Sequence, residues 1–203
     1  GRKQMDKIKS LPDMNMSMIA DTTIYYCSIC ADCADENNVQ KYIGFLDEIY
    51  DYQISSGFEN ISTYLMLIAY AKLYLKLKQY RLAIRYYNDA YRASIVVYGK
   101  DSYNTYVILG ALGIAQRMAG DYVDADFSLD SSINKISQIS PNDNLLYEML
   151  INRYIILYNV GRYSEALSLL EKAKIIYGNF QGKQQQDIDW INQQIENTHQ
   201  HIS

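Results

Sequence analysis

The chain has 203 residues, of which 49% are hydrophobic and only two, Pro12 and Pro141, are proline. This length suits one large domain or two small ones, and the scarcity of proline lets helices run without interruption. The 19 basic and 23 acidic residues are intermixed and give a formal net charge of -4, which argues against nucleic-acid binding because that needs clustered positive charge. The most apolar stretch, residues 64–75, contains Lys72 and is too short to span a membrane, so we expect no membrane insertion.

The sequence begins with Gly1 rather than Met, so we expect that it starts after a processing or truncation point and that any signal peptide or upstream domain lies outside it. Residues 1–20 are predicted to form an N-terminal extension. Helical repeats are predicted over 21–182, in units of about 21–57, 58–100, 101–142 and 143–182, followed by a capping helix and tail over 183–203.

Three cysteines, Cys27, Cys30 and Cys33, stand in the stretch CSICADC. An odd number does not suit a closed disulfide framework, and it favours a reducing compartment and a cytoplasmic location. The spacing also resembles part of an iron–sulfur or zinc site, but such a site needs a fourth ligand, and His199 and His201 are far away in the sequence. Because the surrounding residues have helical periodicity and cysteine is often buried, we expect cysteines that pack in a core and hold no metal.

A phrase of one form occurs three times: a Tyr, an Ala three residues later, a large side chain four further on, and a small residue three after that. Its tyrosines, Tyr80, Tyr122 and Tyr163, are spaced by 42 and 41 residues. A fixed period of this length indicates a repeat array. One period before Tyr80 the pattern predicts a degenerate fourth copy, whose second helix carries Val39, Tyr42, Leu46 and Ile49.

Each phrase follows a stretch that has helical periodicity of its own. Gly120 and Gly161 stand between the two stretches, where a residue that can adopt a left-handed backbone ends a helix. Each unit is therefore predicted to be a helical hairpin. Small residues, among them Gly113, Ala125 and Ala166, are expected where the two helices of a hairpin approach closely.

The C-terminal segment predicts one more helix over residues 184–197. Ile188, Ile191 and Ile195 form a single apolar stripe, and Trp190 lies beside it. A repeat array leaves the apolar face of its last hairpin uncovered, and a helix with one apolar stripe and a polar outer face is suited to cover it. We therefore expect a cap rather than a disordered tail.

In these features the chain resembles the tetratricopeptide repeat family, in a longer-period form similar to the repeats of kinesin light chains. The resemblance covers about residues 64–178, and 21–54 more weakly. Residues 98–106 also resemble the inter-repeat loop of that form, with Tyr103 where its proline is usual. The residues that carry the resemblance are Ala71, Tyr74, Tyr80, Ala83, Tyr87 and Ala90; Gly113, Gly120, Tyr122 and Ala125; and Gly161, Tyr163, Ala166 and Ala173.

The resemblance implies an all-α fold, a right-handed superhelical solenoid of antiparallel helical hairpins with a C-terminal capping helix. Its first helices would line a concave groove that binds a peptide or a partner helix. Ile24 and Cys27 would belong to this groove in the first unit, and in the later units it would be lined by Leu65, Ile68, Lys72, Leu75, Lys76, Val107, Ile114, Arg117, Met118, Ile151, Asn152, Ile155, Tyr158 and Asn159. Most of these residues are apolar, so we expect a partner, a second copy or the chain's own terminus to cover them. Alternatively, some of them pack between repeats, because the helix register can differ by a residue or two.

Some members of the family hold the C-terminal carboxylate of a chaperone with Lys, Asn and Arg side chains on successive first helices. The equivalent positions here include Ala69, Val107 and Ala111, so this clamp is absent. Lys72, Lys76 and Arg117 could attract an acidic segment instead, although basic residues on a helix surface are more often solvated charge.

An enzyme is the rival class of function. The sequence has no nucleophile elbow, P-loop or HExxH motif, and both histidines fall in a polar C-terminal tail that we expect to fray. The glycines of residues 108–120 lack the spacing of a dinucleotide-binding loop, and a carboxylate pair could form only through tertiary contact. We therefore predict a non-catalytic scaffold for protein–protein interaction, without cofactor or metal, that binds a protein or peptide partner or a second copy of the chain through the groove. The alternative is a sensor or regulatory repeat domain of a longer signalling protein.

Overall fold

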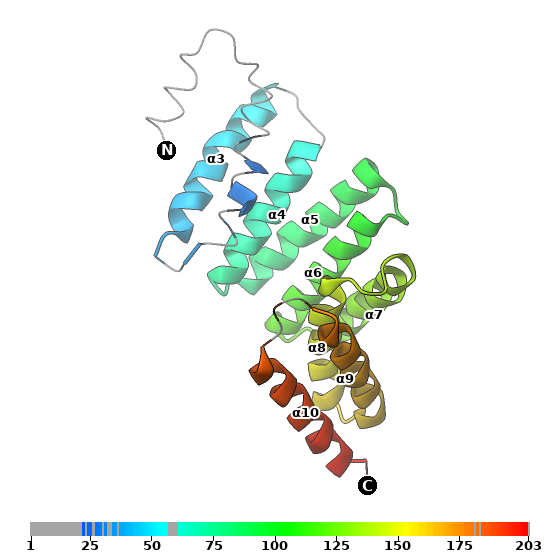
Figure 1. Ribbon diagram of the computed structural model, residues 1–203. Helices are drawn as coiled ribbons and strands as arrows, with labels where there is room; N and C mark the ends of the chain where they lie inside the picture. Colours follow the sequence, from blue (N-terminus) through cyan, green and yellow to red (C-terminus); the bar gives the residue numbers. More distant parts are fainter. Residues whose placement is uncertain are drawn as a thin grey trace. The chain divides into compact units, whose positions relative to one another are not determined.

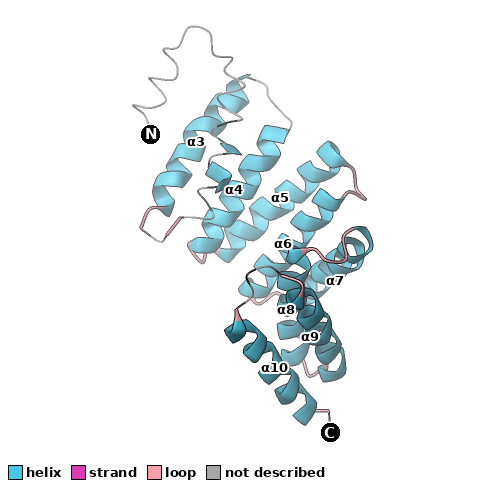
Figure 2. Cartoon of the chain, viewed as in Figure 1, coloured by secondary structure: helices cyan, strands magenta, loops and turns pink. Residues whose placement is uncertain are grey.

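The computed structural model describes residues 22, 24–25, 27–29, 31, 34–35, 37–56, 61–180, 182 and 184–202 (Figure 1). In these ranges the chain consists of helices and the turns between them, with no strand (Figure 2), which confirms the all-α class. The helices are α3 Val39–Ser56, α4 Ile61–Lys76, α5 Tyr80–Tyr98, α6 Tyr103–Ala119, α7 Tyr122–Ile139, α8 Asn144–Asn159, α9 Tyr163–Gly178 and α10 Gln185–Gln200. The chain divides into two compact units, Gly1–Gly99 and Lys100–Ser203, here called the N-terminal and C-terminal units.

In the N-terminal unit, α4 and α5 form a hairpin and α3 packs beside α4. Apolar residues of the degenerate copy meet those of α4 in one core, which includes Ile24, Cys27, Val39, Leu46, Ile49 and Leu73. Cys27 is fully buried there, as expected for a packing cysteine, whereas Cys30 and Cys33 lie outside the described residues.

Tyrosines extend this core toward solvent. The rings of Tyr70 and Tyr86 stack with centroids 4.8 Å apart, and Tyr74 stacks on Tyr86 at 5.4 Å. The hydroxyl of Tyr70 donates a hydrogen bond to Oδ1 of Asp47 at 2.6 Å, and burial followed by this bond raises the pKa of Tyr70. Each ring thus packs in the interface while the Tyr70 hydroxyl ties α4 to α3.

In the C-terminal unit, α6 pairs with α7 and α8 pairs with α9, while α8 also packs against α6 and α7, and α10 packs against α9. The two hairpins share one apolar core, whose fully buried side chains include Leu129, Ile136, Leu146, Leu150, Leu157 and Leu170. The expected C-terminal helix is present as α10.

Small residues stand where the helices of a hairpin approach each other. A Cβ atom on Gly113 of α6 would lie 2.8 Å from Cγ of Leu129 and 3.2 Å from the Leu129 backbone nitrogen on α7. The contact with Cγ is too short for a carbon atom, so a larger residue at position 113 would force Leu129 or the helix backbone to shift. Ala125 and Ala166 are fully buried in the second helices of the two hairpins.

The turn inside each hairpin has the same geometry in all three copies. Gly120 and Gly161 have φ angles of 86° and 80°, and Lys78 occupies the equivalent position with φ 57°. In each turn the next residue donates its N–H to the carbonyl five residues earlier, at 2.9 Å in all three. This hydrogen bond satisfies a carbonyl of the last helical turn, and the left-handed residue that permits it is normally glycine.

Tyr103 links the two hairpins of the C-terminal unit. Its hydroxyl donates a hydrogen bond to Oδ2 of Asp143 at 2.6 Å, while Oδ1 of Asp143 accepts the N–H of Leu145 and caps α8. Partial burial, followed by the bond to Asp143, raises the pKa of Tyr103 to about 12. The aromatic residue of the inter-repeat loop therefore fixes the start of the next hairpin.

The first prediction concerns Lys78. Lys78→Gly is expected to raise the free energy of unfolding by up to about 1 kcal/mol, because relief of a left-handed backbone is worth roughly 1–2 kcal/mol and exceeds the extra chain entropy of glycine, roughly 0.5–1 kcal/mol. Urea unfolding measures the change. The reverse substitution at the matched position, Gly120→Lys, is expected to destabilise, and a loss of stability in Lys78→Gly would contradict the assignment of strain.

The second prediction concerns the helix crossings. Ala125→Leu and Ala166→Leu are each expected to destabilise the C-terminal unit by about 1–3 kcal/mol, because a larger side chain overpacks a filled core. Ser168→Leu adds a side chain of the same kind at an exposed position of α9 and serves as the control. Equal melting temperatures for all three variants and the wild type would show that these alanines do not lie at a close crossing.

The third prediction concerns alkaline stability. The folded-state pKa of Tyr103 lies above the ordinary value of about 10, so its stabilising effect is complete below pH 10 and is lost as the pH rises through 12. The stability difference between the wild type and Tyr103→Phe should therefore shrink between about pH 10 and pH 12, as measured by urea unfolding. Tyr122→Phe, at an exposed position of α7, controls for the loss of a hydroxyl, and a difference that stays constant with pH would argue against this role of Tyr103.

Candidate partner-binding face

The residues that the sequence predicts for a groove lie on the first helix of each hairpin. Five of them are on α4 in the N-terminal unit and nine are on α6 and α8 in the C-terminal unit. We call these two sets the first-helix face of each unit. The prediction was wrong for Ile24 and Cys27, which are fully buried in the core of the N-terminal unit and cannot line a groove.

On the first-helix face of the N-terminal unit, most side chains are partly covered. Leu65 is half-buried and packs against the core, Leu75 is half-buried, and Ile68 is buried. Lys76 donates a hydrogen bond from Nζ to the backbone oxygen of Ala34 at 2.8 Å, and Lys72 is half-buried. The charge of Lys76 is thus used within the unit itself.

On the first-helix face of the C-terminal unit, the apolar side chains form the rim of the core. Val107 and Ile114 on α6 and Ile151 and Ile155 on α8 are half-buried and pack against the buried cluster. They are neither enclosed like core residues nor fully exposed. Gly110 on α6 sits against the flexible end of the Met149 side chain of α8, where the two first helices pack side by side.

A polar contact joins α6 to α8 beside this rim. Nε of Arg117 donates to Oδ1 of Asn152 at 2.6 Å, and Nδ2 of Asn152 donates to the carbonyl of Glu148 at 2.8 Å. Asn152 is buried, whereas Met118 and Asn159 at the ends of the two helices are exposed. Two predicted groove residues, Arg117 and Asn152, therefore bind each other across neighbouring first helices.

An aromatic cluster closes one end of the face. The half-buried Tyr158 ring lies edge-on to Tyr163 at 5.3 Å and to His201 at 5.6 Å, and His201 stacks on Tyr163 at 4.5 Å. The polar composition after residue 197 predicts a frayed tail, but the structure packs His201 against two rings. Sequence reasoning missed this contact, because Tyr163 and His201 lie far apart in the sequence and only the fold brings the two rings together.

Helix α10 covers the outer side of the last hairpin. Ile191 is fully buried and Ile195 packs against the core cluster. Tyr154 donates its hydroxyl hydrogen to Oε1 of Gln194 at 3.2 Å, and the Trp190 ring lies edge-on to Tyr154 at 6.5 Å. The large side chain of Tyr154 on α8 thus reaches the final helix.

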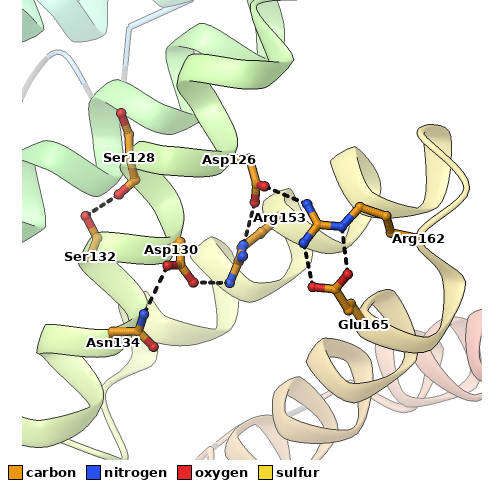
Figure 3. A network of polar contacts seen from close by, with 8 residues as sticks. All are labelled: Asp126, Ser128, Asp130, Ser132, Asn134, Arg153, Arg162 and Glu165. Carbon is orange, nitrogen blue, oxygen red and sulfur yellow. Dashed lines mark hydrogen bonds and ion pairs between the residues drawn. The ribbon is translucent and has the colours of Figure 1, made fainter.

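An ion-pair network on α7, α8 and α9 was not predicted from the sequence (Figure 3). Arg153 pairs with Asp126, with Nε and Oδ1 2.7 Å apart, and also with Asp130; Arg162 pairs with Asp126 at 3.0 Å and with Glu165. The hydrogen bonds from Arg162 lower the pKa of the Glu165 carboxyl. The two aspartates lie one helical turn apart, the one sequence signal that could have suggested a shared cation. Arg153 pairs with both aspartates, and Arg162 also pairs with Asp126, so the network ties α7 to α8 and to the start of α9.

Two wider properties bear on this face. No group of three or more metal-binding side chains occurs within the described ranges. None of the helices in that same part of the chain is both long and apolar enough to cross a bilayer.

Comparison with known proteins agrees with this geometry. Residues 62–134 match the family model described as "Tetratricopeptide repeat", and these residues comprise most of α4 to α7. Among solved structures, BtubC (BKLC) from P. vanneervenii is similar in fold, with a TM-score of 0.62 and 13% sequence identity, over 91% of this chain and 82% of that one. A search among curated proteins gives no match.

Three features therefore agree: the period of about 41 residues, the identical hairpin turns, and the match over α4 to α7. Residues 62–134 thus match the tetratricopeptide repeat family, and the hairpin of α8 and α9 outside that range has the same turn geometry.

Proposed function

We propose that this chain is a non-catalytic interaction scaffold that binds a peptide or helix of a protein partner on its first-helix face. Tetratricopeptide repeats generally mediate protein–protein interaction, and the family is typically non-catalytic. The binding surface and its occupant are our proposal, and a second copy of the chain is one candidate occupant.

The observation that carries the proposal is the row of half-buried aliphatic side chains on α6 and α8. Val107, Ile114, Ile151 and Ile155 each pack on the core with one side and keep part of their surface exposed. The fully buried residues of the core come from other positions of the same helices, and these four side chains lie around them. Apolar surface that remains exposed in a row favours burial by a partner.

The polar residues of the face support an apolar mode of recognition. Arg117 and Asn152 bind each other, so the centre of the face in the C-terminal unit offers aliphatic surface more than charge. Met118 and Asn159 are exposed at the ends of their helices, and an unbranched methionine adapts readily to different partners. We therefore expect partner segments with two or more aliphatic side chains.

The proposal of a non-catalytic role rests on how the ionisable groups are used. The carboxylates of Asp126 and Asp130 are paired with Arg153. His201 is stacked on Tyr163. These groups have structural partners in the folded chain, which leaves them poorly suited to proton transfer.

The fourth prediction tests the face with polar variants. Ile114→Glu and Ile155→Lys are expected to keep the helical circular-dichroism spectrum and to weaken partner capture or self-association by about tenfold or more, because binding would desolvate the new charge. Sedimentation velocity measures self-association, and capture with the tagged chain followed by mass spectrometry measures partner binding.

Val123→Glu is the matched control, because it places the same charge at an exposed position of α7 on the second helix. This variant should bind as the wild type does. If Ile114→Glu unfolds the chain, the side chain belongs to the core, and the milder Ile114→Thr then tests the surface. Folded variants with undiminished association would remove the first-helix face from consideration.

A further inference from the structure

Helices α7 and α9 flank a space whose base is formed by α8. Ion pairs fill one end of this space, and the other end is open. Toward the start of the two helices the space is occupied by the ion pairs that Arg153 and Arg162 make with Asp126, Asp130 and Glu165 (Figure 3). Toward their ends no such side chains meet, and a cavity of about 330 Å³ remains. The two halves of one interface are thus built differently.

The base of this cavity is apolar. Ile133 of α7, Leu150 of α8 and Ile176 of α9 line it, and all three are otherwise buried in the core of the unit. Ile175 stands at the rim with 69% of its surface exposed. An aliphatic side chain this exposed, next to an apolar cavity, gains free energy if a partner covers both.

The remaining wall is polar and carries a positive charge. Asn134, Ser137 and Lys172 line it. Asn134 donates from Nδ2 to Oδ2 of Asp130 at 3.1 Å, which turns its amide toward the filled half. Lys172 is exposed and has no ion-pair partner among the described residues, so the cavity offers one ammonium group to a negative ligand.

We infer that this cavity is a second docking site, which takes one large apolar side chain from a helix of a protein partner and pairs a carboxylate on that helix with Lys172. Its volume lies at the small end of the range for ligand sites, which suits a single side chain. The backbone groups of α7 and α9 are hydrogen-bonded within their own helices and offer nothing to an extended strand, whereas a helix satisfies its own backbone. We assign a carboxylate to the partner helix because Lys172 carries a positive charge at the wall of the cavity.

This site is separate from the first-helix face, because it is lined mainly by second helices. A partner could therefore contact the chain through either surface, and the two proposals can fail independently. The experiment is arranged so that each surface is observed through isoleucines of its own.

The test uses the full chain with labelled isoleucine methyl groups and two synthetic peptides. Each peptide is an alanine-rich helix of roughly 18 residues, long enough to fold alone, with one leucine and, four residues later, either Glu or Lys. Methyl NMR is expected to show shifts of Ile133, Ile175 and Ile176 on titration with the Glu peptide. The methyl groups of Ile114 and Ile155 report the first-helix face and should stay unchanged.

The charge assignment is tested by exchange. Lys172→Glu is expected to weaken binding of the Glu peptide by about fivefold and to favour the Lys peptide instead, as an exposed ion pair allows. Lys174→Glu makes the same change at a neighbouring exposed position that does not line the cavity, and it should have little effect. Lys172→Gln serves if the charge reversal lowers stability.

Three results would overturn the inference. These are the absence of shifts at the three cavity isoleucines at millimolar peptide, equal affinity of the wild type for the two peptides, and an effect of Lys174→Glu as large as that of Lys172→Glu. Shifts confined to Ile114 and Ile155 would instead place peptide binding on the first-helix face alone, and would leave the cavity without a ligand.

Discussion

Each hairpin of this chain depends on two helices that approach so closely that only a small residue fits between them. At Gly113 a single Cβ atom would lie too close to the Leu129 side chain of α7 and tightly against its backbone nitrogen, and Ala125 and Ala166 are fully buried in the second helices. The close approach sets the positions of the turn and of the buried side chains. It also decides which faces of each helix are left for contacts with other molecules.

The two kinds of helix use their remaining faces in different ways. First helices keep aliphatic side chains at the rim of the core, and their polar residues bind one another, as Arg117 and Asn152 do. Second helices of the C-terminal unit instead carry acidic side chains, and the two aspartates of α7 pair with Arg153, which reaches them from the first helix α8. One surface is thus suited to apolar burial, and the other combines fixed ion pairs with an open cavity.

Much of the fold could be read from the sequence, because repetition exposes what each copy requires. The spacing of Tyr80, Tyr122 and Tyr163 predicts the hairpins, and Gly120 and Gly161 predict their left-handed turns, which the φ angles confirm. Lys78 could be placed in such a turn only by its register with the two glycines.

The finer details of the candidate face could not be predicted. Arg117 and Asn152 lie 35 residues apart in the sequence, and the torsions of a long side chain decide whether they meet. The burial of Ile68 likewise depends on small rotations of a helix, to which a repeat period is insensitive.

The shared role of Arg153 has a consequence for how such a sequence can diverge. If Asp126 is lost, Arg153 keeps Asp130 and Arg162 keeps Glu165; if Arg153 is lost first, Asp130 has no cation among these partners. Replacing one acid thus leaves each arginine with a partner, whereas replacing Arg153 leaves Asp130 with only the amide of Asn134 among the described residues.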